Sequence, residues 1–168
     1  MQTKLTAKTI SAAGILIAAE IVLSRFLSIQ TWNLRIGFSF IPIVIAAILF
    51  GPITAGLIAV LSDLIGYFLV PSGTFFPGFT VTACITGVVF ALFLYKKQSL
   101  PRIIAAVLST QILLSLGINT LWLSILYGTA YKVLFLTRIY QVVAMSIVQI
   151  VLILIISKKI IPVLKRIM

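Results

Sequence analysis

The chain has 168 residues, of which 62% are hydrophobic and only 9% charged, whereas a soluble domain is about 45 to 50% apolar and about 25% charged. This deficit of charge excludes a water-soluble surface and predicts an all-α integral membrane protein whose 13 basic residues meet anionic lipid rather than nucleic acid. The chain has no His, one cysteine (Cys84) and two carboxylates (Glu20 and Asp63), which excludes histidine-based and cysteine-cluster catalytic or metal sites. We therefore expect neither an enzyme nor a bound cofactor or metal.

Six apolar runs, separated by charges and by Gly or Pro, predict six transmembrane helices in one membrane-embedded domain over residues 1–168. At about 20 residues per span, six spans use about 120 residues and leave no room for a soluble catalytic domain. No phosphate-binding glycine motif occurs, so the chain cannot hydrolyse ATP by itself. The predicted spans are about Thr9 to Leu27, Gly37 to Phe50, Ile53 to Val70, Phe79 to Tyr95, Ile103 to Tyr127 and Val133 to Ser157.

The basic residues predict the orientation of this bundle. With an even number of spans both termini lie on one side, and that side carries nine basic residues against four on the other. The excess of Lys and Arg places both termini in the cytoplasm, so the connections around Trp32, Phe76 and Tyr131 face outward. The nine are Lys4, Lys8, Lys96, Lys97, Arg102, Lys158, Lys159, Lys165 and Arg166, and the four are Arg25, Arg35, Lys132 and Arg138.

Small residues recur along one face of the first span. Ala7, Ser11, Gly14 and Ala18 follow one another at spacings of four, three and four residues. Such a stripe lets two helix backbones approach closely in lipid. It predicts either close packing inside the bundle or contact with a helix of a partner protein.

Polar and aromatic side chains occur at similar depth in three of the predicted spans. A charged group inside a span costs about 2.5 to 3.5 kcal/mol on insertion scales, so it needs a partner, a water-filled cavity or a ligand. Three such faces at one depth predict a binding pocket near the outer surface. The residues are Asp63 and Tyr67 in the third span, Asn119 and Trp122 in the fifth, and Arg138, Gln141, Met145 and Gln149 in the sixth.

Several of these residues also have a structural alternative. Asp63 and Arg138 would satisfy each other as an ion pair between helices, with no ligand involved. Tyr67 is also expected in the aromatic belt at the membrane surface. Asn119 and Gln141 are equally able to hydrogen-bond across helices.

Six short runs of the sequence carry a family resemblance: residues 34–38, 41–42 and 49–52, and residues 63–66, 72–80 and 119–124. The first three runs resemble the membrane-embedded S component of energy-coupling factor (ECF) vitamin transporters, and the last three resemble its folate-specific branch. The similarity covers most of the chain, from Ala7 to Gln149.

The resemblance implies a six-helix substrate-binding subunit of the bacterial cytoplasmic membrane. Such a subunit docks on a transmembrane coupling protein and two cytoplasmic ATPases, and it topples in the membrane to release the vitamin inward. The small-residue stripe Ala7, Ser11, Gly14 and Ala18 would then contact the coupling protein. The outer loops would cover the vitamin with Trp32, Arg35, Phe75, Phe76 and Gly78.

The residue types suit folate or a related pterin. Aromatic faces match its rings, Asp63 is able to accept hydrogen bonds from pterin N–H groups, and arginine forks match the two carboxylates of its glutamate tail. This chemistry alone does not select folate over thiamine or riboflavin. The alternatives are therefore an S component for another vitamin, or a structural or assembly protein without ligand. A self-sufficient secondary transporter is disfavoured, because at most two carboxylates lie inside the membrane.

Overall fold

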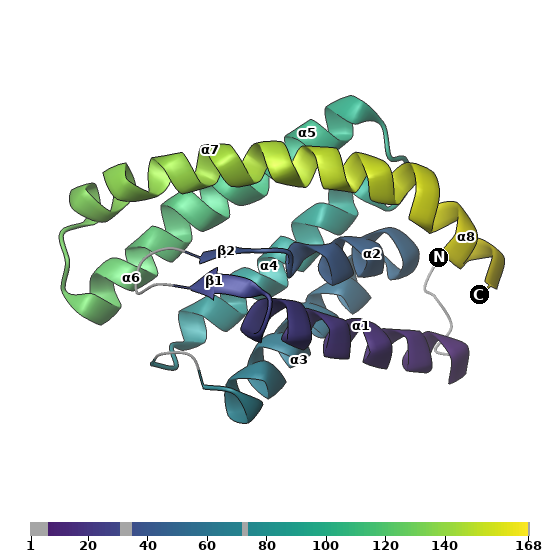
Figure 1. Ribbon diagram of the computed structural model, residues 1–168, viewed down its shortest axis with the longest axis horizontal. Coiled ribbons are helices and arrows are strands. Elements are labelled where there is room, and N and C mark those ends of the chain that lie inside the picture. The colour runs from purple at the N-terminus through teal and green to yellow at the C-terminus, as the bar shows by residue number, and fades with distance from the viewer. Residues whose placement is uncertain (1–6, 31–34, 72–73, 168) are drawn as a thin grey trace.

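The computed structural model describes residues 7–30, 35–71 and 74–167 of the chain, and these form an elongated bundle of helices with one small hairpin (Figure 1). The hairpin lies towards one end of the bundle, together with the connections from α3 to α4 and from α6 to α7; we call this the hairpin end. The last helix and the start of the first lie at the other end, here called the α8 end. The elements are α1 (Ala7–Arg25), β1 (Ser28–Gln30), β2 (Arg35–Gly37), α2 (Phe40–Phe50), α3 (Pro52–Leu69), α4 (Pro77–Leu94), α5 (Leu100–Leu108), η1 (Ser109–Ile118), α6 (Asn119–Tyr127), α7 (Tyr131–Ile155), η2 (Ile156–Ile160) and α8 (Ile161–Ile167).

Five helical segments of the described chain are long and apolar enough to cross a membrane. Two of them are compound: α5, η1 and α6 run continuously over 28 residues, and α7 continues through η2 into α8. The segments η1 and η2 are π-helical, with wider turns than an α-helix. The predicted all-α membrane bundle is confirmed, and helix boundaries differ from the predicted spans by only a few residues, except that the last helical segment continues past the predicted end at Ser157 to Leu164. The five are Ala7–Arg25, Pro52–Leu69, Pro77–Leu94, Leu100–Tyr127 and Tyr131–Leu164.

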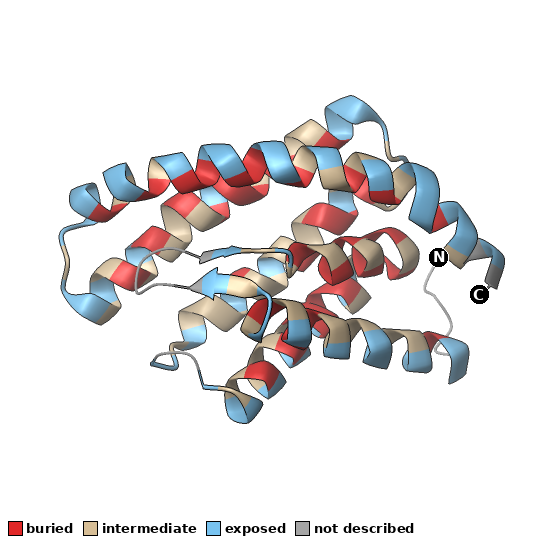
Figure 2. Ribbon diagram, viewed as in Figure 1, coloured by how far each residue is buried: buried red, intermediate tan, exposed pale blue. Residues whose placement is uncertain are grey.

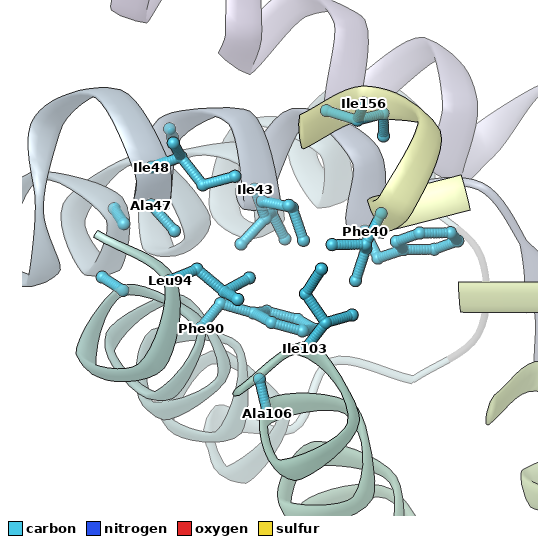
Figure 3. Packing of buried hydrophobic residues seen from close by; sticks show 14 of the residues in the cluster. Phe40, Ile43, Ala47, Ile48, Phe90, Leu94, Ile103, Ala106 and Ile156 are labelled. Atoms are coloured by element: carbon cyan, nitrogen blue, oxygen red, sulfur yellow. The ribbon is translucent and has the colours of Figure 1, made fainter. Parts of the chain in front are cut away.

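The second predicted span is a special case, because α2 has only 11 residues. At 1.5 Å per residue it is about 16 Å long, roughly half of the hydrocarbon thickness. It is apolar all round, and a helix of this kind belongs in the interior. Figure 3 shows Phe40, Ile43, Ala47 and Ile48 of α2 gathered with Phe90, Leu94, Ile103, Ala106 and Ile156 from the surrounding helices in one apolar cluster. The short helix therefore forms the centre of the core.

Helices α3 and α4 approach each other closely because glycines lie at their contact. A Cβ atom added to Gly87 would lie 2.7 Å from the Ala55 carbonyl oxygen, and one added to Gly56 would lie 3.1 Å from Cγ2 of Val88. Small residues at such a contact are what allows backbone-to-backbone packing in lipid. The close contact places the start of α4 beside the far end of α3, where the candidate site lies.

The connection between the first two helices contains an antiparallel hairpin, which the sequence did not indicate. Ser28 pairs with Gly37, and Gln30 pairs with Arg35. A side chain at Gly37 would collide with Ser28, so glycine permits the pairing. Strand β2 contacts α7, which brings the backbone of Arg35 towards the helix that carries Arg138.

Burial follows the pattern expected for a protein surrounded by lipid. Figure 2 shows buried residues along the inward faces of α1 and α7 and exposed residues along their outward faces. Many exposed side chains are large and apolar, among them Phe68 and Tyr140. The described surface between the two ends suits hydrocarbon rather than water.

Candidate ligand-binding site

An aromatic stack, formed by Phe76, Phe79 and Trp122, lies between the start of α4 and α6. The rings of Phe76 and Trp122 are 5.4 Å apart between centroids, tilted by 48°, and Phe79 approaches Phe76 edge-on at 5.9 Å. A Cβ atom at Gly78 would collide with Phe76 and lie 2.8 Å from the Trp122 indole. Only glycine at this position lets both rings approach the start of α4. Three of the predicted site residues, Phe76, Gly78 and Trp122, are thus brought together.

Hydrogen bonds hold the indole of Trp122 in place. Its Nε1–H donates to Oγ1 of Thr82 at 3.1 Å, and the Thr82 hydroxyl donates to the Gly78 carbonyl oxygen at 2.8 Å. Thr82 is buried, so both bonds are shielded from water. The first turns of α4 therefore fix the position of a flat aromatic surface supplied by α6.

A second aromatic pair lies at the end of α3. The rings of Tyr67 and Phe75 are 5.0 Å apart, and the ring of Phe68 lies 5.9 Å from Tyr67. Phe75 is exposed, whereas Tyr67 is partly buried. This pair borders the connection between α3 and α4, so both predicted residues lie at the hairpin end and neither is fully buried.

Asp63 does not pair with Arg138, and that alternative of the sequence analysis is wrong. Its Oδ2 accepts a hydrogen bond from the Thr80 hydroxyl at 2.7 Å, and its Oδ1 lies 3.9 Å from Nη2 of Arg25. The guanidinium of Arg25 reaches Asp63 across Gly66, where a Cβ atom would lie only 3.1 Å from Nε. Arg25 contacts the carboxylate because Gly66 has no side chain that would block the guanidinium.

Arg138 lies in the interior with little to neutralise it. Its side chain is only 5% exposed, and its Nη1–H donates to Oγ1 of Thr120 at 3.2 Å. Its Nε has no hydrogen-bond partner among the described residues, and neither Glu20 nor Asp63 lies within ion-pair distance of it. A buried charge without a counter-ion costs several kcal/mol in a membrane, about 2.5 to 3.5 on insertion scales. This cation therefore has unused capacity to bind an anion.

Two amide oxygens on the helices that carry Thr120 and Arg138 also lack a partner among the described residues and are free to accept hydrogen bonds. Oδ1 of Asn119 and Oε1 of Gln149 are buried without a hydrogen-bond partner in the described part of the chain. Gln141 is buried on the same face of α7 as Arg138, together with Met145. The polar stripe predicted on the sixth span is confirmed as an inward face. Buried amide oxygens and a buried guanidinium suit a ligand with both N–H donors and carboxylates.

Two predicted site residues are not placed by the structure. Trp32 lies outside the described residues, and for Arg35 only the backbone in β2 is described.

No group of three or more His, Cys, Asp or Glu side chains that would hold a metal ion occurs within the described residues.

The sequence analysis missed four polar residues that organise the site. Thr80, Thr82 and Thr120 each hold a predicted site residue through a hydroxyl group, and Arg25 was counted only for orientation. Threonine in an apolar helix is a weak signal, since its hydroxyl usually bonds its own backbone. Arg25 was a stronger candidate for a site residue, because a basic residue at a helix end is expected to pair with a carboxylate and the chain has only two.

The small-residue stripe of α1 lies on the surface. Ala7, Ser11, Gly14 and Ala18 are all exposed, and a Cβ atom at Gly14 would meet nothing within 4 Å. The stripe therefore does not pack against other described parts of the bundle, which was one of the two uses predicted for it.

The fold and the candidate site define a multi-pass membrane protein with a cluster of polar and aromatic side chains inside its helix bundle. The chain belongs to the family of S components of ECF-type riboflavin transporters, whose family model matches residues 4–166. It is thus a transporter subunit of the bacterial cell membrane, as its resemblance to ECF S components predicted.

Individual relatives narrow the comparison to folate proteins. The chain is 46% identical over 127 residues to the folate transporter FolT of Clostridium novyi, covering 75% of this chain and 74% of that protein. It is 35% identical over 130 residues to FolT of Leuconostoc mesenteroides, covering 76% and 70%. A crystal structure of FolT bound with folic acid superposes with a TM-score of 0.88 at 33% identity, covering 93% of this chain and 98% of that one. These relatives agree with the predicted folate-specific branch.

Proposed function

We propose that this protein captures folate at the outer face of the membrane and delivers it inward as the S component of an ATP-driven ECF transporter. The observation that carries the proposal is the match, over nearly the whole chain, to a folate transporter whose structure contains folic acid. The chemistry of the site supports it independently. A flat aromatic surface, orphaned amide oxygens and an unneutralised arginine correspond to the pterin ring, its N–H groups and the carboxylates of folate.

The proposed site is built from four helices and two connections. The pterin and the central ring would lie against aromatic side chains, and the glutamate tail would meet arginine. The residues proposed to line the site are Trp32, Arg35, Tyr67, Phe75, Phe76, Gly78, Asn119, Trp122, Arg138 and Gln141, and Asp63 is proposed to serve the site through its contacts with Thr80 and Arg25.

Ligand titration on the purified protein in detergent tests this proposal. For a ligand of about 32 non-hydrogen atoms at about 0.3 kcal/mol each, binding is worth roughly 10 kcal/mol, which corresponds to a dissociation constant of tens of nanomolar. Riboflavin and thiamine are the comparison ligands, riboflavin because the family model is named for it. Tighter binding of either than of folate would replace folate as the substrate, and no binding of any would favour a structural role.

Arg35 is proposed to hold the glutamate tail from the hairpin. Replacing it with Ala should weaken folate binding by about 10-fold to 150-fold, the equivalent of about 1.5 to 3 kcal/mol for a hydrogen bond to a charged group. Lysine should restore only part of the affinity, because it keeps the charge but lacks the planar fork. Pteroic acid, which lacks the glutamate, is the control. Its affinity should hardly change, and an equal loss for both ligands would remove Arg35 from the tail site.

The partners proposed for delivery are a transmembrane coupling protein and two cytoplasmic ATPase subunits. The chain itself carries no ATP-binding motif, so the energy must come from another protein. The exposed small-residue stripe of α1 supports a docking role, since it lets a partner helix approach the α1 backbone closely. Membership of the S-component family supports the same assembly.

We propose further that the hairpin end faces outward and the α8 end faces the cytoplasm, as the basic residues predict. In a variant with Cys84 replaced by Ser, a cysteine at Thr74 should react with a membrane-impermeant thiol reagent in intact cells. A cysteine at Ser99, in the exposed connection before α5, should react only after lysis. The opposite labelling pattern would invert the topology and move the site to the cytoplasmic side.

A further inference from the structure

Three helices are joined at the hairpin end by one carboxylate. Arg25 ends α1, Asp63 lies in the last two turns of α3, and Thr80 lies in the first turn of α4. The Thr80 hydroxyl donates to one oxygen of Asp63 at 2.7 Å, and the Arg25 guanidinium lies 3.9 Å from the other. We call Arg25, Asp63 and Thr80 the clasp.

The backbone of α3 is shaped for this contact. Gly66 lies one turn beyond Asp63, and a Cβ atom there would lie 3.1 Å from Nε and 3.5 Å from Nη2 of Arg25. A methyl group at position 66 would make the guanidinium shift by a few tenths of an ångström, and the pair is already long at 3.9 Å. Glycine at position 66 therefore leaves the room in which Arg25 approaches Asp63.

The clasp is connected to the aromatic stack through the first turns of α4. Thr80 lies between Gly78, which leaves room for Phe76 and Trp122, and Thr82, which accepts the indole N–H of Trp122. These residues share two consecutive helical turns, so fixing Thr80 against α3 fixes the groups that hold the indole. Both oxygens of Asp63 are engaged in the clasp, and its side chain is only 23% exposed.

We propose that Arg25 and Asp63 are positioning residues, which hold the start of α4 so that Trp122 and Phe76 present a preformed surface to the ligand. This inference rests on the proposed function, because folate binding is one of its readouts. It assigns Asp63 an effect through Thr80 and Trp122, and not a direct contact with the ligand. Binding to a preformed surface is stronger because the ordering of the site is completed before the ligand arrives.

Substitutions at Thr80 test the proposed positioning role most directly. Thr80→Val keeps the shape of the side chain but removes the donor, and it should weaken folate binding by about 3-fold to 10-fold, the effect of losing one hydrogen bond. Thr80→Ser keeps the hydroxyl and should bind like the wild type. Thr86→Val is the matched control, because the Thr86 hydroxyl donates only to a carbonyl of its own helix, that of Thr82 at 2.7 Å. Equal affinities for the Val and Ser variants at position 80 would overturn the proposal.

A measurement without ligand separates this inference from the proposed function. In a Trp32→Phe background Trp122 is the only tryptophan of the chain, so its fluorescence reports the stack directly. Thr80→Val and Asp63→Asn should shift its emission to longer wavelength and increase its quenching by acrylamide, with helix content unchanged. If these variants weaken folate binding while the emission of Trp122 stays the same, Asp63 contacts the ligand directly and the inference is wrong. If wild-type protein binds no folate, the proposed function fails, and the emission still decides the role of the clasp.

Gly66 tests the contribution of Arg25. Gly66→Ala alone should reproduce the shift in Trp122 emission, and Gly66→Ala combined with Arg25→Ala should give no larger shift than Arg25→Ala alone, because both changes break the same contact. Gly117→Ala is the control, since a Cβ atom there meets only the Ile112 carbonyl oxygen, at 3.5 Å. Additive shifts from the two changes would show that Gly66 acts independently of Arg25, and Arg25 would then not be a positioning residue.

Discussion

Replacing Arg138 with Met should weaken folate binding by about 30-fold or more and, at the same time, make the unliganded protein more stable. The loss of affinity follows because removing one partner of a buried charge pair costs about 2 to 5 kcal/mol, leaving one of the two ligand carboxylates without its cation. The gain in stability follows because Arg138 is only 5% exposed and has no carboxylate within ion-pair distance in the described chain, so an apolar side chain removes an uncompensated charge. Titration and thermal unfolding in detergent measure the two effects.

The opposite signs of these two effects separate a binding residue from a structural one. If Arg138 only held α6 and α7 together through Thr120, the Met variant would be less stable, and its affinity would fall only through misfolding. Lys132→Met is the matched control, because it removes the same charge from an exposed position at the start of the same helix. It should change neither property appreciably. Arg138→Lys should recover part of the affinity, as expected for a charge without the bidentate fork.

Replacing Gly14 with Trp should abolish folate uptake by cells while leaving folate binding to the isolated subunit nearly unchanged. Gly14 lies in the middle of the exposed stripe of α1, and a Cβ atom there meets nothing within 4 Å, so the indole will not disturb the fold. A large side chain on this face would keep a partner helix from reaching the α1 backbone. Uptake in whole cells and titration of the purified subunit measure the two functions separately.

Ala144→Trp provides the control for this substitution. Ala144 is small, exposed and on α7, so the change adds a comparable volume to a different face of the bundle. Its uptake should remain close to that of the wild type. If Gly14→Trp abolished binding and uptake together, α1 would support the ligand site itself; if it left both intact, the docking surface would lie elsewhere.

Composition and periodicity were sufficient to predict the class of protein, its helices and the inward face of α7. These features are local consequences of hydrophobicity: a run of about 20 apolar residues must cross the bilayer as a helix, because no other open structure satisfies its backbone hydrogen bonds there. The polar residues interrupting such runs, Asp63, Asn119 and Arg138, were identified for the same reason, since each is costly in lipid. The order of the family-like runs along the chain also predicted the transporter family.

The tertiary structure decided which of these groups meet. By charge alone Asp63 could have paired with any of the three arginines on its side of the bundle, Arg25, Arg35 and Arg138. The room left by Gly66 lets Arg25 contact Asp63, and Arg138 has no carboxylate within ion-pair distance among the described residues. The surface position of the α1 stripe likewise depends on where the other helices pack, because its spacing is equally suited to an internal contact. The chain by itself thus determined which residues are costly to place in a membrane. Their partners were decided only by the packing of the helices, because contacts between residues far apart in sequence depend on helix rotation and on the sizes of the side chains between them.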